Sequence, residues 1–473
     1  MATRNRKRFV LAGVGAFIAA GLLGTLGIAA TQGSAQNTPS PTPTPSAEAS
    51  AVATPTAMPT PTVPAPVEAP MAVPFGPLAA EPYRAYTGDG DCLNVRPVPG
   101  TTFQGDPRTC VPEGFLLWLY GEPKVVDGRE WRYALGEGWV ASEYVKPAPG
   151  AATGFGPFRS VTVSAQAGEV TKLASVSKSG AVSNLPLLPS AIRGLGDVPP
   201  AISPDGQWGA YGREERYVPT LTIRNMADGT EMKYPQAHLA SWGPANRLLI
   251  RMGTNCPQQC TWTTGWIDPR EGILHPLTEK KNDWYTFTWA KDGLSLYVIE
   301  AGVLKHVRFD GTAETVPLQN AGEMAWGEMS VSEDGRRLVV SPFQGAISII
   351  DLQTGIVSKI QRAPQIVAGG RCGGGGSSLT TWLDANTVIW HESYAEKGGN
   401  GITISNVNGG GRRLIPFFTV SDIRTVAPNL VSFVTFDDPG NKDGSGGFQL
   451  TWLLDTTTNE ARPVTVGAAP QWE

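Results

Sequence analysis

From about residue 155 onward, the chain alternates between short apolar segments and tight polar turns. The clearest unit runs from Ala201 to Tyr211. It has an apolar pair, a Ser-Pro-Asp-Gly turn at 203–206 and an alternating segment that ends on an aromatic residue. Alternation with a period of two predicts half-buried β-strands, and Asp-Gly is a preferred hairpin turn. The unit therefore predicts a β-hairpin.

Variants of this hairpin recur along the rest of the chain. Close copies begin at Trp289 and Val331, and weaker copies lie at 242–250, 382–390 and 426–433. After several of them come a third strand and a second turn, at 228–229, 310–311 and 354–355. The copies lie roughly 40–50 residues apart, which is the spacing of four-stranded propeller blades.

These hairpins resemble the propellers of the TolB-like and WD40-like class, with their Ser-Pro-Asp-Gly turns. The resemblance implies a β-propeller over residues 155–473, with six blades visible as repeats. Residues 469–473 are typical of an inner strand with no blade after it, and residues 158–190 of outer strands with no inner strand before them. Joining the two ends would make a seventh blade and remove the exposed sheet edges.

Residues 79–148 predict a second, smaller β unit. Its segments are, in order, Cys92–Arg96 with a Pro-Gly turn, a Glu-Gly turn, the apolar run Phe115–Tyr120, a Trp segment at 131–133, and Gly138–Val140 close before Tyr144. This order resembles the bacterial SH3-like domain. The resemblance implies a small barrel with one internal disulfide, between Cys92 and Cys110. The fold class we expect is all-β: an SH3-like barrel followed by a six- to seven-bladed propeller.

The N-terminus predicts export. Four basic residues between Arg4 and Arg8 precede an uncharged run, 9–30, which predicts a hydrophobic helix. Residues 1–36 are either a cleaved signal peptide or an uncleaved anchor, since the run is long enough to span a bilayer. Residues 37–78 carry repeated Thr-Pro and Ser-Pro steps and predict a disordered Pro/Thr-rich linker. We therefore expect an extracytoplasmic protein, secreted or anchored at the cell surface.

Composition agrees with many short strands and narrows the partners. Charged residues make up 17% of the chain, whereas Gly (56) and Pro (40) are abundant. The net charge is −4 although four basic residues stand at the N-terminus, so the remainder is more acidic still. A general nucleic-acid binder needs cations to neutralise phosphate, and we expect no nucleic-acid partner.

Cysteine usage agrees with an oxidising compartment. Cys92 with Cys110 and Cys256 with Cys260 are local pairs, which predict disulfides in an exported protein, whereas Cys372 stands alone. The Cys256/Cys260 pair could instead be half of a metal site. A second Cys or His pair at suitable spacing is missing, so a disulfide is the preferred interpretation.

No motif in the sequence predicts a reaction. The four histidines His238, His275, His306 and His391 are far apart, and neither HExxH nor Gly-x-Ser-x-Gly occurs. We assign no catalytic, cofactor-binding or metal-binding residue and expect no cofactor.

Three further features have two interpretations each. The glycine run 373–376 lacks the Lys-Ser/Thr of a phosphate loop and predicts an inter-blade loop. Residues 437–444 resemble a calcium loop only in part, because the first and twelfth ligand positions do not match, and predict a polar hairpin loop. In the small unit, we expect Trp118, Trp131 and Trp139 in the core, whereas Tyr83 and Tyr86 could line a groove.

Together these features predict a non-catalytic binding protein of the cell envelope. The SH3-like unit would contact cell-wall material, and the propeller would bind a peptide, a glycan or another envelope protein. An uncleaved N-terminal segment would add contact with the membrane. One alternative is a glycan-cleaving enzyme with carboxylates converging in the propeller mouth. Another is a membrane-anchored sensor or assembly scaffold.

Overall fold

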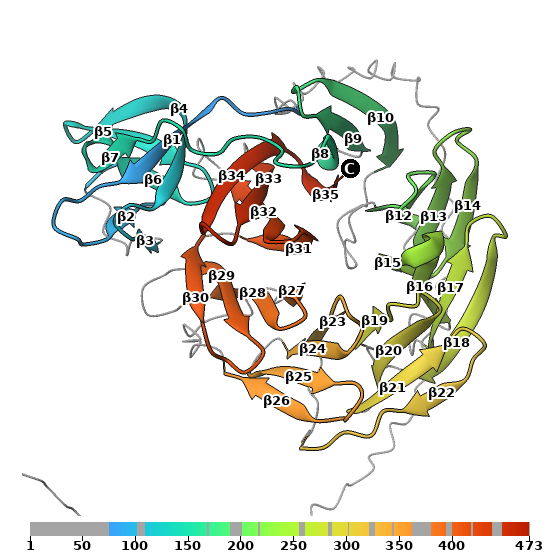
Figure 1. The fold of residues 1–473 in the computed structure, drawn as a ribbon. Coiled ribbons are helices and arrows are strands. Elements are labelled where there is room, and N and C mark those ends of the chain that lie inside the picture. Colours follow the sequence, from blue (N-terminus) through green and yellow to red (C-terminus); the bar gives the residue numbers. More distant parts are fainter. Residues whose placement is uncertain are drawn as a thin grey trace, which may run out of the picture. The chain divides into compact units, whose positions relative to one another are not determined.

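Strands dominate the described chain: there are 35 of them, and the only helical elements in this part are two three-residue 3₁₀ turns (Figure 1). The structure is a computed structural model. It describes residues 75–101, 109–167, 170–189, 201–215, 218–254, 261–281, 286–300, 302–320, 327–342, 345–361, 380–393, 400–417, 420–437 and 447–472. All of these residues belong to one compact unit, 68–473.

The first seven strands form a small barrel, called here the N-terminal barrel. A five-stranded sheet has the order β6-β5-β4-β1-β7, and the hairpin β2-β3 is joined to it by a bridge between Arg96 and Trp139. The elements are β1 (Ala80–Ala85), β2 (Leu93–Val95), β3 (Thr109–Val111), β4 (Leu116–Val126), β5 (Arg129–Ala134), β6 (Gly138–Ala141), η1 (Ser142–Tyr144) and β7 (Val145–Pro147).

The apolar run at the start of β4 is buried on both faces of its sheet. Leu117 and Leu119 point into the core of the barrel, where they meet Val95 and Val140. Leu116 and Trp118 alternate with them and belong to a different cluster, one that continues into the propeller. A continuous apolar run is the pattern of a strand that is covered on both sides.

The remaining strands form seven four-stranded antiparallel sheets arranged around a ring (Figure 1). Blade 1 contains β11 (Ala201–Ile202), β12 (Trp208–Glu215), β13 (Val218–Asn225) and β14 (Glu231–Pro235). Blade 2 contains β15 (Ala237–Trp242), β16 (Leu248–Thr254), β17 (Thr261–Asp268) and β18 (Ile273–Lys281). Blade 3 contains β19 (Thr286–Trp289), β20 (Ser295–Glu300), β21 (Val303–Arg308) and β22 (Ala313–Thr315). The turn η2 (Pro244–Asn246) joins β15 to β16.

The other four blades complete the ring. Blade 4 contains β23 (Gly327–Val331), β24 (Arg337–Pro342), β25 (Ile347–Asp351) and β26 (Val357–Ile360). Blade 5 contains β27 (Thr380–Asp384), β28 (Thr387–Ser393), β29 (Asn400–Asn406) and β30 (Arg413–Pro416). Blade 6 contains β31 (Ser421–Ala427), β32 (Leu430–Asp437), β33 (Phe448–Asp455) and β34 (Glu460–Val466). Blade 7 contains β35 (Ala468–Trp472), β8 (Ser160–Ala167), β9 (Val170–Ser177) and β10 (Val182–Pro189). The predicted all-β fold is confirmed, and the blades number seven.

The ring closes by joining the two ends of the propeller. The last strand, β35, pairs antiparallel with β8, so that Trp472 lies opposite Val161 and Ala468 opposite Ser164. The indole of Trp472 packs on Phe158, with ring centroids 4.8 Å apart, and on Phe155 at 6.2 Å. The predicted closing blade is therefore present.

Side chains link neighbouring inner strands around the ring. Each link crosses from one blade to the next: Trp289 donates to Ser241, Trp382 to the Ser330 carbonyl, Thr425 to the Trp382 carbonyl and Gln471 to the Ile202 carbonyl. The ring is thus held by hydrogen bonds as well as by the apolar clusters between blades.

The predicted N-terminal helix and nearly all of the predicted linker lie outside the described residues. Among the residues that are described, no helix is long and apolar enough to cross a membrane. The linker was expected to reach residue 78, yet Phe75 packs against the blade 7 cluster and the Gly76 carbonyl accepts a hydrogen bond from the Val466 N–H. Contacts with the propeller are therefore present at Phe75 and Gly76, within the range expected for the linker, because the aromatic side chain of Phe75 is partly buried there.

Candidate functional site

One face of the ring is called here the turn face. It carries the turns that join the third to the fourth strand of each blade and, in blades 1–6, those that join the first to the second strand. In the first turn of blade 1, Asp205 Oδ1 accepts hydrogen bonds from the Ser203 hydroxyl (2.6 Å) and the Gln207 N–H (3.0 Å). Blade 4 repeats the arrangement with Asp334, the Ser332 hydroxyl and the Arg336 N–H. The short side chain of aspartate reaches back to its own turn, which explains why Asp recurs there.

These hydrogen bonds set the protonation state of the turn acids. The hydroxyl of Ser332, followed by the Arg336 N–H, lowers the pKa of Asp334. Hydrogen bonds within their turns likewise lower the pKa of Asp228, Asp310 and Asp351. A general acid needs the opposite shift, toward the working pH. These four carboxylates therefore cap turns and are poorly suited to donate protons.

The turns of neighbouring blades are also bonded to each other. Asn246 Oδ1 accepts the Asp205 N–H at 3.0 Å, and the Arg247 guanidinium donates to the Gly293 carbonyl at 3.1 Å. Arg337 joins blades 4 and 5 in the same way, donating to Asn386 Oδ1 at 2.7 Å. Such bonds hold the turn face as a rigid surface.

A polar cavity of about 340 Å³ opens on this face between blades 5 and 6. Its charged groups are Asp384 and Arg413, and Leu383 and Ile404 supply its apolar part. Arg413 also donates to the Thr456 carbonyl across the two blades. The other lining residues are polar or small: Thr387, Ser405, Asn406, Gly411, Asn429, Thr456 and Thr457. Hydroxyl and amide groups in this number suit a small polar ligand.

Blade 3 contains a serine, a histidine and an aspartate within hydrogen-bond reach. Ser295 Oγ lies 2.7 Å from His306 Nε2 and 2.8 Å from Asp292 Oδ2. In a catalytic triad the histidine stands between the nucleophile and the acid, whereas here the acid bonds the serine directly. Ser295 is also only 1% exposed. Asp292 is exposed and His306 is half-buried, so the group is a structural network around one buried serine.

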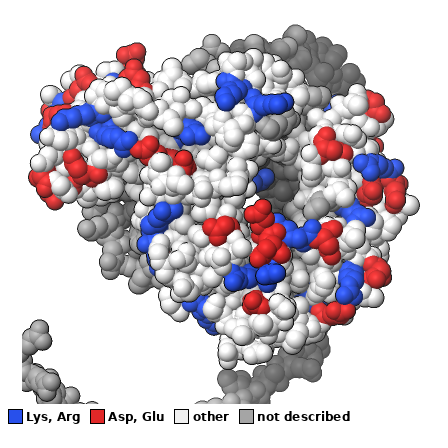
Figure 2. Space-filling view, viewed as in Figure 1, with Lys and Arg blue, Asp and Glu red and all other residues white. Residues whose placement is uncertain are grey.

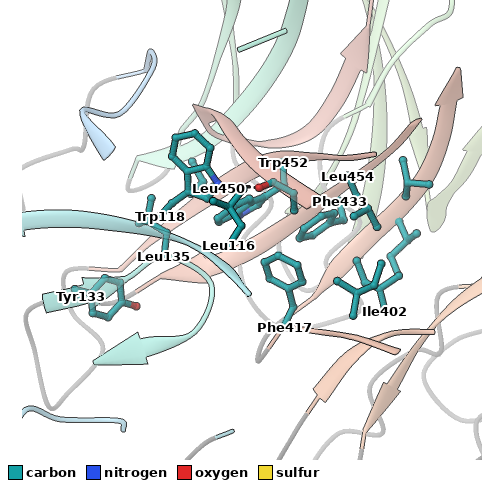
Figure 3. Packing of buried hydrophobic residues seen from close by; sticks show 14 of the residues in the cluster. Leu116, Trp118, Tyr133, Leu135, Ile402, Phe417, Phe433, Leu450, Trp452 and Leu454 are labelled. Carbon is teal, nitrogen blue, oxygen red and sulfur yellow. Dashed lines mark hydrogen bonds between the residues drawn. The ribbon is translucent and has the colours of Figure 1, made fainter. Parts of the chain in front are cut away.

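The N-terminal barrel and blade 6 share one apolar cluster, called here the junction. Leu116, Trp118 and Leu135 of the barrel pack beside Leu450 and Trp452 of the propeller (Figure 3). The Trp118 Nε1–H donates to the Ala461 carbonyl at 2.8 Å, so the polar end of the buried indole is satisfied by the other domain. At the rim, Arg84 forms an ion pair with Glu460.

A glycine brings the barrel backbone close to the propeller. Gly136, between β5 and β6, has φ +75°, and a Cβ there would lie 3.1 Å from Phe417 and 3.4 Å from Thr435. Its N–H donates to Asp437 Oδ1 at 2.5 Å. Positive φ and close approach together account for glycine at this position.

Two acids are buried at this contact. Asp437 is fully buried, and Glu137 is 2% exposed. Burial raises the pKa of Glu137 well above its ordinary value, and the charge of Asp437 raises it further. A carboxyl in an apolar site favours its neutral form.

The predicted site residues have mixed outcomes. The structure contains a disulfide between Cys92 and Cys110, with Cα atoms 5.4 Å apart. Cys256, Cys260 and Cys372 lie outside the described residues. No group of three or more His, Cys, Asp or Glu side chains that could hold a metal occurs within the described ranges.

The three tryptophans of the barrel lie at the junction with the propeller, and its two candidate groove tyrosines lie beside cations. Trp118, Trp131 and Trp139 were expected in the barrel core, and all three are buried, but they belong to the junction cluster. Tyr86 is 43% exposed and lies under the Lys146 ammonium. Tyr83 is half-buried below the Arg132 guanidinium. The two tyrosines are therefore partnered by cations.

Of the predicted polar loop 437–444, only Asp437 is described, and it is buried at the junction. Sequence analysis did not find Glu137, the burial of Asp437 at the junction, or the polar cavity. The unbroken apolar run of β4 was the one pattern that could have indicated a second buried face.

Figure 2 shows acidic and basic side chains interspersed over the visible face and around the central opening.

The sequence matches no protein-family model and no curated protein sequence. Among solved structures, the chain is similar to TolB from Acinetobacter baumannii (15% identity, 63% of this chain and 79% of that one, TM-score 0.37). It is also similar to the β-propeller domain of the Trilobed protease from Pyrococcus furiosus (14%, 67% and 97%, 0.35). A third is a 6-phosphogluconolactonase-like structure from Bacteroides fragilis (11%, 69% and 100%, 0.42). Likeness at this level indicates nothing about function.

Proposed function

We propose that this chain is an exported, non-catalytic binding protein of the cell envelope, whose propeller holds a neutral sugar unit of a cell-wall glycan in the polar cavity between blades 5 and 6. The cavity is the observation that carries the proposal. It lies on the rigid turn face, and a preformed site loses little entropy when it binds.

The lining of the cavity matches the chemistry of a sugar. The hydroxyls of Ser405, Thr456 and Thr457 already donate within the protein, so they face a ligand as acceptors. Thr387 and the amides of Asn406 and Asn429 can supply donors as well as acceptors, as a ring of hydroxyl groups requires. One acid and one base, Asp384 and Arg413, balance each other, so a neutral ligand is favoured over an ion. The volume of about 340 Å³ is at the lower end for small-molecule sites, which sets the size at one or two sugar units.

Two features support binding rather than cleavage. The turn acids Asp228, Asp310, Asp334 and Asp351 are held ionised by their own turns. Within the lining of the cavity, Asp384 is the single carboxylate, whereas glycoside hydrolysis uses a pair.

Two features support export: the sequence of the first 30 residues and the disulfide of the N-terminal barrel. The basic tip and the uncharged run 9–30 are typical of an export segment. The Cys92–Cys110 disulfide would persist in an oxidising compartment.

The test is calorimetric titration of the purified full chain with the disaccharide of N-acetylglucosamine. We expect Thr387→Leu, which fills the cavity, to weaken binding at least tenfold, because about 1.4 kcal/mol corresponds to that factor. The matched control is Thr315→Leu, which changes an exposed strand threonine in blade 3, outside the lining of the cavity. Equal affinity in both variants, or no binding by the parent, would contradict the proposal. Cleavage of the disaccharide would make the protein an enzyme.

A further inference from the structure

Glu137 is a buried acid with no hydrogen-bond partner among the described residues. It lies in the turn between β5 and β6, on the side of the barrel that faces blade 6, and neither of its carboxylate oxygens is bonded within the described structure. An isolated ionised carboxylate is very costly to bury, whereas its neutral form is much less so. The side chain therefore needs either a cation or a proton.

Within the part of the chain that the structure describes, no cation is paired with Glu137. None of the ion pairs among the described residues includes Glu137, and the charged group whose field acts on it is Asp437 of β32. Two of the groups that hydrogen-bond Asp437 are neutral hydroxyls, those of Tyr133 on β5 and Thr435 on β32. Phe417, which packs on the same turn, is apolar.

Asp437 and Glu137 differ in the number of hydrogen-bond donors around them. Asp437 accepts hydrogen bonds from the Gly136 N–H, the Tyr133 hydroxyl and the Thr435 hydroxyl. Three donors stabilise a carboxylate, so Asp437 carries the negative charge. Glu137 has no donor and stands beside that charge, so the proton of the pair belongs on Glu137.

We propose that Glu137 is a pH-sensitive latch of the junction: the barrel stays docked on blade 6 while the buried carboxyl carries a proton, and the junction loosens when the proton leaves. The inference does not depend on which ligand the propeller takes. A chain outside the cytoplasm meets the pH of its surroundings, so the latch would couple external pH to the mobility of the barrel.

The direction of the effect follows from the direction of the shift. The pKa of Glu137 is raised in the docked state above its ordinary value of 4.5, which it regains when the junction opens. The docked state therefore binds more protons than the open state. Its stability is fully present below about pH 4.5 and is lost as the pH rises from there through the raised pKa. A one-proton linkage changes the opening constant by up to tenfold per pH unit.

The first experiment follows opening of the junction in the full chain. Hydrogen exchange of the segments 131–141 and 448–455 is measured by mass spectrometry between pH 4.5 and 8.5 and corrected for the intrinsic rate. We expect opening in the parent to rise with pH by up to tenfold per unit. Glu137→Gln, which is neutral at every pH, should abolish that rise. The control Glu130→Gln alters an exposed acid of the same hairpin and should keep the parent's pH dependence.

The second experiment needs no variant. Infrared spectra of the parent at pH 7 should contain the carbonyl band of one protonated carboxyl, because exposed acids are ionised there. Absence of that band overturns the latch. The latch is also overturned if Glu137→Gln opens with the same pH dependence as the parent, or if opening in the parent does not change with pH.

Discussion

Two contacts join parts of this chain that lie more than 300 residues apart, and they are built in opposite ways. At the ring closure, β35 pairs with β8 through the backbone, and Ser164 bonds the Ala468 carbonyl across a separation of 304 residues. At the junction, no strand of the barrel pairs with the propeller in the described sheets. Side chains make that contact, such as Trp118 with Ala461 across 343 residues.

The difference concerns both stability and control. Backbone groups do not titrate in the ordinary pH range, so a ladder gives a closure that is indifferent to pH. A side-chain interface can contain an ionisable group, and the junction contains Glu137 beside Asp437. We infer that the ring is the permanent part of the molecule and the junction the adjustable part.

Deletion of residues 468–473 would have the largest effect. It removes the inner strand of blade 7 and leaves β8 with an unpaired edge. Phe155 and Phe158 also lose the Trp472 indole. We expect loss of most of the propeller's stability, which for domains is about 5–15 kcal/mol, measured by calorimetry and near-ultraviolet circular dichroism. Deletion of residues 37–74 is the control and should leave the transition unchanged. Equal melting of the C-terminal deletion and the parent would refute closure by β35.

Trp118→Ala should have the next largest effect, confined to the junction. The indole is buried, and truncating a buried Trp costs about 3–5 kcal/mol. We expect the barrel to melt separately from, and below, the propeller in differential scanning calorimetry. Trp118→Phe keeps most of the packing and removes the hydrogen bond to Ala461, so it should cost about 1 kcal/mol. A single unshifted transition in Trp118→Ala would show that the junction does not couple the domains.

The ring could be predicted from the sequence because its information is local and repeated. Each hairpin carries its own turn residues, as Asp205 and Asp334 do, and the six copies correspond to six of the seven blades. Even the closure was predictable, since a lone inner strand at 469–473 needs outer strands elsewhere. Repetition therefore revealed a contact that spans most of the chain.

The junction could not be predicted in the same way, because it depends on which surfaces meet. Trp118 was expected in the core of its own barrel, and it is buried in the cluster shared with the propeller. Glu137 in a Gly-Glu-Gly turn has the sequence of an exposed turn residue, yet it is buried. The polar cavity likewise combines residues from four separate turns, two in blade 5 and two in blade 6, and from the strands beside them. Such positions have no periodicity of their own.

Gly136→Ala should have the smallest effect of the three, and its matched control isolates the contact with the propeller. Alanine at φ +75° is strained, and its Cβ would press on Phe417 and Thr435. We expect a loss of about 1–3 kcal/mol in the unfolding free energy, measured by chemical denaturation. Gly114 of the same barrel has nearly the same backbone, φ +78°, but nothing lies within 4 Å of the Cβ position. Gly114→Ala therefore bears the backbone strain alone, which costs about 1 kcal/mol. The excess loss in Gly136→Ala measures the close approach at the junction. Equal losses in the two variants would mean that the barrel does not press on blade 6 at this point.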